Sequence, residues 1–159
     1  YWGTGGEKMT DHFVVESFGM TELIESSILL YGNDIRNQLK APKFSELYSD
    51  VKHHYETIRK YAQNTRRSIY SFGWMLDIAR CIYTLHTGKI IAKTDAGQWA
   101  LENNFCPVPD ALKTALKVRK SPLEFKKDES TLDYAQTLGE LIQKFADVLE
   151  KKLEKYSCI

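Results

Sequence analysis

Cysteine is scarce in this chain, where Cys81, Cys106 and Cys158 are the only three among 159 residues. They are odd in number and scattered, and they form neither a C-x-x-C pair nor a cluster with histidine. We therefore expect free thiols, as in a protein of the reducing cytoplasm. The neighbouring His53 and His54 point in different directions on a helix, so they are not a metal pair of the i,i+4 kind.

An excess of charge of one sign is also missing, because 22 basic side chains face 21 acidic ones and the formal net charge is +1. Such a balance produces no long-range field, so it does not indicate non-specific binding to nucleic acid or to a membrane surface. No apolar run approaches the length of about 18 residues that a membrane-spanning helix needs. No signal peptide is recognisable either, and we expect a cytoplasmic protein.

Several catalytic motifs are absent as well. The opening "YWGTGG" is rich in glycine, but it lacks the Lys-Ser/Thr ending and the following helix of a P-loop. The chain has no Asp-x-Asp pair of the kind that binds catalytic Mg²⁺, and no Ser/His/Asp or Cys/His arrangement stands out. Because the chain starts at Tyr1 in a glycine-rich stretch, we expect either one domain of a longer protein or a trimmed start.

What the sequence does contain is helical periodicity. Apolar residues at helical spacing predict five principal helices, over residues 45–64, 65–86, 95–103, 109–120 and 130–156. The second is apolar most of the way round, which is typical of a central helix, and Gly88 is a good stop after it. The short links between the helices predict an all-α antiparallel bundle.

The N-terminal part has a different pattern. Thr21 can cap a short helix through Ile24, and "SILLYG" at 27–32 is a short apolar run that could be a strand. A lone strand cannot satisfy its own backbone groups, so it would need a partner outside the chain or the segment "FVV" at 13–15. After it, "DIRNQLK" predicts one or two helical turns.

The stretch "TGKIIAKTDAGQW" places Lys89 and Lys93 just before a new helix. We expect Thr94 or Asp95 to cap that helix, with Asp95 and Gln98 at the spacing of a capping box. Free N–H groups, the helix dipole and Lys93 would together form a site for a phosphate-sized anion. The alternative is a solvated lysine in a loop, which spacing alone favours, and Lys89 is expected to be plain surface charge.

Two further pairs lie on the central helix. Trp74 and Asp77 are three residues apart and face one side, where a carboxylate beside an aromatic ring could hold an amine-rich ligand or simply form the edge of the core. Arg80 and His86 match the Arg-x5-His pair of HEPN-type ribonucleases. Positions six apart are about 120° apart around a helix, so the plain interpretation is an Arg80–Asp77 salt bridge and a histidine favoured by the helix dipole.

The block "IARCIYTLHTGKIIAKTDAGQWALE", residues 78–102, resembles the C-terminal helical domain of aminoglycoside nucleotidyltransferases, of the type that adenylylates streptomycin and spectinomycin. The shared run is Arg-x-x-Tyr-Thr-Leu-x-Thr-Gly, a lysine step and then Ala-x-x-Trp. "SSILLYGNDIRNQLKAPKFSEL" and "PVPDALKTALKVRKSP" extend the resemblance over most of the chain from about residue 12.

The resemblance implies a two-domain enzyme that transfers AMP from ATP to a hydroxyl of an aminoglycoside-type acceptor. Residues 1–32 would then be a linker from an N-terminal nucleotidyltransferase domain, and residues 33–159 the C-terminal helical bundle. That N-terminal domain, as partner, would carry the Mg²⁺-binding carboxylates, so no catalytic or metal-binding residue is expected in this chain and the chain alone should be inactive. ATP and Mg²⁺ would be cofactors of the full-length enzyme only.

The resemblance assigns Lys93 to the lysine that contacts ATP and Arg80 to a structural position. The acidic residue that the family uses on the drug falls near Tyr70, which departs from the streptomycin-type pattern. Trp74, Asp77 and Tyr70 are therefore the candidates for binding an acceptor. Two alternatives stay open, a HEPN-type ribonuclease or toxin–antitoxin protein that uses Arg80 and His86, and a helical interaction domain without catalysis.

Overall fold

The computed structural model describes the whole chain except residues 1, 4–5, 8, 10–14 and 157–159. It divides into two compact units, residues 1–42 and residues 43–159, which we call the N-terminal unit and the helical unit. Helices dominate the described residues, so the predicted all-α class is confirmed. None of the helices among them is long and apolar enough to cross a bilayer.

The N-terminal unit contains a small antiparallel hairpin, in which β1 (Trp2–Gly3) pairs with β2 (Gly6–Glu7). The helix α1 (Ser17–Ser26) and the 3-10 turn η1 (Arg36–Gln38) follow. Thr21 lies inside α1 and its hydroxyl donates to the Ser17 carbonyl, so the prediction that it caps the helix is wrong.

The predicted strand over residues 27–32 is also wrong, because these residues belong to no ladder. Ser27 has extended backbone angles, but a strand needs a partner for its N–H and C=O groups and the described residues provide none here. The segment "FVV" lies mostly outside the described residues. Ile28 and Leu30 are 82% and 92% exposed, and Gly32 turns the chain with φ of +91°.

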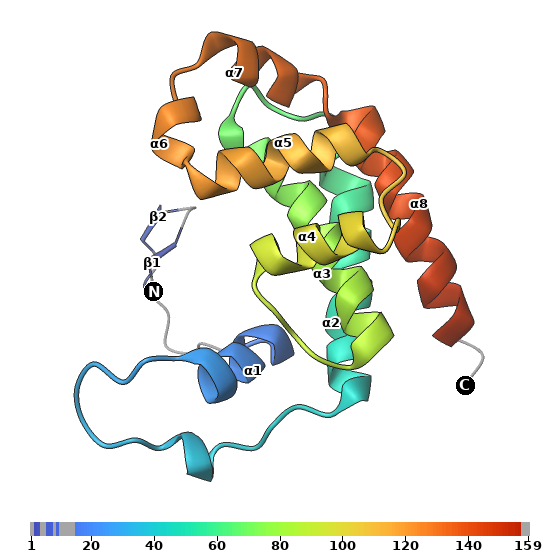
Figure 1. Cartoon of the computed structure of the whole chain (residues 1–159). Helices are drawn as coiled ribbons and strands as arrows, with labels where there is room; N and C mark the ends of the chain where they lie inside the picture. Colours follow the sequence, from blue (N-terminus) through green and yellow to red (C-terminus); the bar gives the residue numbers. More distant parts are fainter. Residues whose placement is uncertain (1, 4–5, 8, 10–14, 157–159) are drawn as a thin grey trace. The chain divides into compact units, whose positions relative to one another are not determined.

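The helical unit is built around one helix, α3 (Gly73–Thr87). It packs against α2 (Phe44–Tyr61), α4 (Lys93–Glu102), α5 (Pro109–Lys120) and α8 (Gly139–Tyr156). Met75, Ile78 and Ile82 of α3 are fully buried, which confirms that this most apolar helix is central. Figure 1 shows α4 and α5 crossing α3.

The helix boundaries follow the sequence closely in two places. The helix α5 spans the predicted residues, with Pro109 at its first position. The helix α3 ends at Thr87, and Gly88 follows as its C-cap with φ of +70°, which suits a residue without a side chain. The predicted helix over 65–86 begins later, since residues 69–72 form the 3-10 turn η2 (Ile69–Phe72).

The last predicted helix is divided in the structure. Two short helices, α6 (Pro122–Phe125) and α7 (Glu129–Gln136), precede α8. The break falls just before Gly139, where an added Cβ would lie 1.9 Å from the Gln63 carbonyl oxygen. The segment that follows α2 therefore passes directly against the first residue of α8, where only glycine leaves room for it.

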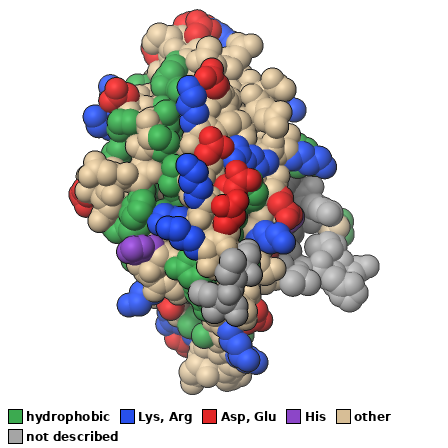
Figure 2. Space-filling model, turned by 90° about the vertical axis from the view of Figure 1, so that its right-hand side faces the viewer, with side chains coloured by type: hydrophobic (Ala, Val, Ile, Leu, Met, Phe, Trp, Pro, Cys, Tyr) green, Lys and Arg blue, Asp and Glu red, His purple; other side chains and the backbone are tan. Residues whose placement is uncertain are grey.

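Charged side chains of both signs are mixed over the surface. Figure 2 shows lysines and arginines interspersed with aspartates and glutamates on the visible face. This agrees with the nearly balanced total charge.

Candidate functional site

The candidate site lies where the start of α4 meets the middle of α3. The ammonium Nζ of Lys93 is 2.6 Å from the carboxylate Oδ1 of Asp77. Lys93 is the first residue of α4, and Asp77 lies in the second turn of α3. The turn after Gly88 thus brings together two charges that are sixteen positions apart in the sequence.

Small residues on α4 allow this close approach. Ala96 and Ala100 are fully buried, and a Cβ added to Gly97 would come within 2.9 Å of Leu116 and 3.0 Å of Leu76. Only a helix with such small side chains can lie this near to α3 and α5 without displacing their leucines. The packing of α4 therefore fixes the distance between Lys93 and Asp77.

Arg80 adds a second positive charge to the site. Its Nη2 is 3.9 Å from the same Oδ1 of Asp77, as the spacing of i and i+3 on one helix allows. The side chains of Arg80 and Asp77 are only 11% and 17% exposed, whereas that of Lys93 is 31% exposed. The cluster of Asp77, Arg80 and Lys93 thus places two cations beside one carboxylate, with Lys93 as its most exposed member.

The N-terminus of α4 differs from the predicted one. The helix begins at Lys93, its N-cap residue is Ala92, and no side chain caps its first turn. Asp95 lies within the first turn, and Gln98 donates to the Glu102 carboxylate. The predicted cap at Thr94 or Asp95 and the Asp95–Gln98 capping box are therefore wrong, because the helix starts two residues before Asp95.

Lys89 is exposed in the loop between α3 and α4. Its backbone N–H donates to the Thr87 hydroxyl, and its position fits the surface charge expected of it.

The thiol of Cys81, which follows Arg80 in α3, is buried. Its burial, together with the charge of Asp77, raises the pKa of this thiol. Cys81 and Cys106 are free, as predicted, and Cys158 lies outside the described residues.

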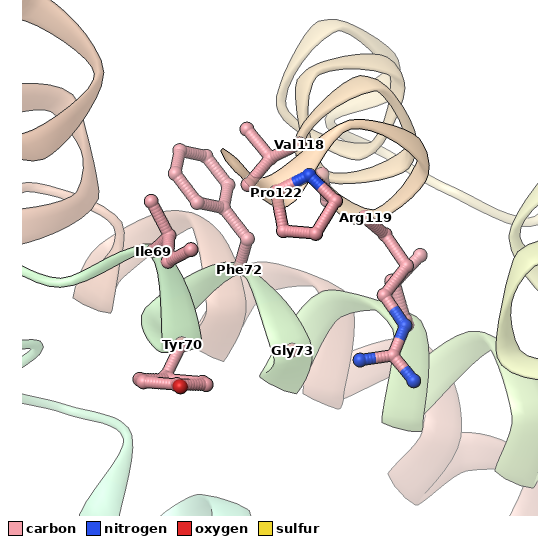
Figure 3. A pocket seen from close by; sticks show the side chains of 9 residues that line it. Ile69, Tyr70, Phe72, Gly73, Val118, Arg119 and Pro122 are labelled. Carbon is pink, nitrogen blue, oxygen red and sulfur yellow. The ribbon is translucent and has the colours of Figure 1, made fainter. Parts of the chain in front are cut away.

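The other predicted acceptor residues lie nearer the start of α3. Trp74 is half-buried in the first turn of α3, one turn before Asp77. Tyr70 belongs to η2, is 71% exposed and lines a small pocket with Gly73 and Arg119 (Figure 3). Sequence reasoning did not single out Arg119, since its place beside Tyr70 depends on the packing of α5 against η2.

Arg80 and His86 occupy different surroundings. Arg80 is buried beside Asp77, whereas His86 is exposed at the end of α3. The His86 ring lies 5.6 Å from Trp99 and 5.8 Å from Phe105, and these two rings stack on each other at 4.8 Å. The plain interpretation of the pair fits these positions, since Arg80 lies 3.9 Å from Asp77 and His86 lies in the last turn of α3.

No group of three or more metal-ligating side chains occurs in the part of the chain that the structure describes. The cluster of Asp77, Arg80 and Lys93 has a single carboxylate, which two cations already face. This set of side chains therefore lacks the several carboxylates that a Mg²⁺ site uses.

Comparison with known proteins gives one match. The family model described as the aminoglycoside adenylyltransferase C-terminal domain matches residues 44–152. No curated protein and no solved structure matches the chain. The matched region includes α2 to α7 and nearly all of α8, and thus the whole candidate site.

Proposed function

Since this chain belongs to the aminoglycoside adenylyltransferase C-terminal domain family, we propose that it holds the triphosphate of ATP through Lys93 during nucleotidyl transfer. The observation that carries this proposal is the position of Lys93. It is the most exposed member of the cluster with Asp77 and Arg80, at the start of a helix whose first turn has no side-chain cap. Ammonium, helix dipole and free N–H groups all attract a polyanion.

Asp77 has a positioning role in this proposal. A lysine on a flexible stem loses side-chain entropy when it binds a phosphate, and an ion pair at 2.6 Å restricts that stem in advance. Arg80 compensates the charge of Asp77, so that the carboxylate does not repel the approaching nucleotide. Lys93 is then preorganised for charge that develops on the phosphates in the transition state.

The proposed reaction is the transfer of AMP from ATP to a hydroxyl of an aminoglycoside-type acceptor. Positioning and charge neutralisation dominate such transfers, and Mg²⁺ with its carboxylates would come from an N-terminal nucleotidyltransferase domain. The described residues hold no cluster fit for that metal. The 159-residue chain alone is therefore proposed to be inactive.

Tyr70, Trp74 and Asp77 remain the proposed acceptor contacts. Tyr70 is accessible, with 71% of its surface exposed. Asp77 is less so, and an ammonium group of an aminoglycoside would have to share its carboxylate with Lys93. Binding of acceptor and nucleotide would then be coupled through this one side chain.

The test uses the full-length enzyme that carries this chain behind its nucleotidyltransferase domain. Lys93→Ala should lower kcat/KM for ATP by about 10- to 100-fold, the effect of losing a hydrogen bond to a charged group. Lys89→Ala is the matched control, since this exposed lysine lies four residues before Lys93, in the loop that leads to α4. Asp77→Asn should raise KM for ATP by a smaller factor, because it frees the lysine stem without removing the ammonium.

Unchanged ATP kinetics in Lys93→Ala, or an equal loss in Lys89→Ala, would remove Lys93 from the nucleotide site. The isolated 159-residue chain serves as a separate sample with MgATP and streptomycin. Formation of adenylylated drug by that sample would contradict the proposed inactivity.

A further inference from the structure

The N-terminal unit exposes a run of large apolar side chains between α1 and η1. Ile28, Leu30 and Tyr31 are 82%, 92% and 97% exposed, and Leu29 is 49% exposed. Figure 1 shows this part of the chain as a loop that leads from α1 to η1. A folded protein seldom leaves a contiguous apolar patch in water, and such a patch marks an interaction site. We call residues 27–32 the apolar segment.

The backbone of the apolar segment is unpaired as well. Residues 28–32 form no backbone–backbone hydrogen bond with another described residue, and they belong to no ladder. Ser27, at the start of the segment, has extended backbone angles with φ of −73° and ψ of 150°. The N–H and C=O groups of the segment are therefore open to a partner that has free backbone groups of its own.

One arginine holds both ends of the loop. The Arg36 guanidinium donates from Nη1 to the Ser27 carbonyl at 2.9 Å and from Nε to the Asp34 carboxylate at 2.8 Å. The hydrogen bonds from Arg36 hold the pKa of the Asp34 carboxyl at about 2, so the pair stays charged at neutral pH. A closed loop thus presents the apolar segment, and binding orders it at a lower entropy cost than a free chain.

A concave surface accompanies the apolar segment. Leu23, Leu29 and Ile35 are among the residues that line it, and its volume is about 380 Å³. Since a cavity of about 150 Å³ holds a benzene ring, this one has room for more than one side chain of a partner. The charged groups in its lining, Asp34 and Arg36, already face each other, so it offers apolar contact rather than a site for an ion.

The surroundings of the segment decide between kinds of partner. Glu22, Glu25 and Asp34 lie within a few residues of it, and Arg36 is the only basic residue between positions 17 and 39, so anionic lipids would be repelled. A second copy of the segment would supply only a two-stranded ribbon, which is marginally stable in water. The edge of an existing sheet pairs with backbone groups and covers apolar side chains at the same time.

The family match indicates where such a sheet would be. The matched C-terminal domain begins at residue 44, after the apolar segment, and the proposed function requires a nucleotidyltransferase domain on its N-terminal side. We propose that the apolar segment adds as a strand to an open sheet edge of that domain in the full-length enzyme, with Ile28 and Leu30 on one face and Leu29 on the other. The proposal rests on the proposed function for the presence of this domain, but not on the role of Lys93.

The experiment compares amide hydrogen exchange, resolved to single residues, in the full-length enzyme and in the 159-residue chain. In the 159-residue chain, the amides of residues 28–32 should exchange at the rate of an unstructured peptide. In the full-length enzyme, every second amide of the segment should exchange at least about 100-fold more slowly, because an added strand directs alternate N–H groups to its partner. Neither ATP nor acceptor is present, and full-length Lys93→Ala should show the same protection.

A pair of variants tests the side chains of the segment. In the full-length enzyme, Leu30→Asp should reduce the protection at least about 10-fold, because it places a carboxylate where an apolar side chain is covered. Leu123→Asp is the matched control, since Leu123 of α6 is 87% exposed and lies in the helical unit. It should leave the exchange of the segment unchanged. Thermal unfolding of both variants, followed by circular dichroism, verifies that a lost protection does not come from a lost fold.

Equal exchange of residues 28–32 in the two proteins would overturn the proposal. Uniform protection of consecutive amides would overturn the added strand, since it shows burial without alternate pairing. Protection in the 159-residue chain that increases with its concentration would identify a second copy as the partner and overturn the assignment to the other domain. The ATP kinetics of Lys93→Ala do not enter these results, so a failure of this proposal is distinguishable from a failure of the proposed function.

Discussion

At the scale of single residues, Arg59 joins α2 to α8. Its guanidinium donates to the carboxylates of Asp147 and Glu150 at 2.6 and 2.7 Å and to the Gln143 carbonyl at 3.2 Å. The Tyr55 hydroxyl donates to Glu150 and accepts from Arg59. Such a network stabilises more than an isolated surface pair, because each charge has several partners in one geometry.

This network makes stability depend on pH. The hydrogen bond from Tyr55 and the charge of Arg59 hold the pKa of Glu150 below its usual range. A carboxylate with a lowered pKa in the folded state stabilises the fold above the pKa of the unfolded chain, and this contribution is lost as the pH falls through the folded pKa. Glu150 is 44% exposed, so its contribution is modest.

Glu150→Gln should therefore lower the free energy of unfolding by about 0.5–1 kcal/mol at pH 7, and the difference from the wild type should shrink below about pH 4. Urea unfolding at several pH values measures it. Glu56→Gln, on the exposed face of α2, is the control and should stay within about 0.5 kcal/mol of the wild type throughout. A constant difference across the pH range would contradict the assigned role of Glu150.

At the scale of elements, the packing of α8 depends on Gly139. Its missing side chain allows the Gln63 carbonyl, just after α2, to approach the first residue of α8. Leu138 and Ile142 next to it are fully buried, so this junction belongs to the core. A carbonyl belongs to the backbone and cannot rotate away as a flexible side chain can.

Gly139→Ala should accordingly destabilise the chain by about 3 kcal/mol, since the backbone of one segment must move. Gly73→Ala provides the control, because its Cβ meets no atom within 4 Å and alanine restricts the unfolded chain. In urea unfolding, the free energy of unfolding of Gly139→Ala should be below that of the wild type. The free energy of unfolding of Gly73→Ala should equal or exceed that of the wild type. Similar stability of Gly139→Ala and the wild type would show that the junction adapts.

At the scale of the whole molecule, the helical unit has a core of its own. The fully buried residues of α3 are surrounded by α2, α4, α5 and α8, which all lie in residues 43–159. The family match over residues 44–152 falls entirely within the same unit.

A chain without residues 1–42 should therefore keep its helical circular dichroism and unfold in one cooperative step. Its midpoint temperature should differ from that of the whole chain by less than about 5 °C, which corresponds to about 1 kcal/mol. Calorimetry of both chains measures this. A broad, non-cooperative transition in the shortened chain would contradict the independence of the helical unit.

Features that depend on near neighbours along the chain could be predicted from the amino-acid pattern. Apolar spacing and Pro109 define α5, and the apolar run of α3 with Gly88 behind it defines the central helix and its end. Proline at a helix start and glycine after a helix end act through the backbone geometry of a few residues, so their effect does not depend on distant segments. For Lys93 the local pattern alone favoured a solvated lysine, the family resemblance assigned it to ATP, and that role stays a prediction.

Features that depend on contacts between distant segments could not be predicted in this way. The close approach of the Gln63 carbonyl to Gly139 depends on the packing of α8, and the pocket beside Tyr70 depends on the packing of α5. The partner of Lys93 is Asp77 on another helix, and the start of α4 at Lys93 accompanies that contact. Helical periodicity predicts which face of a helix is buried, but it does not predict which side chain of another helix contacts that face. The contact between Lys93 and Asp77 depends on how closely α4 approaches α3, and the small residues of α4 set that approach.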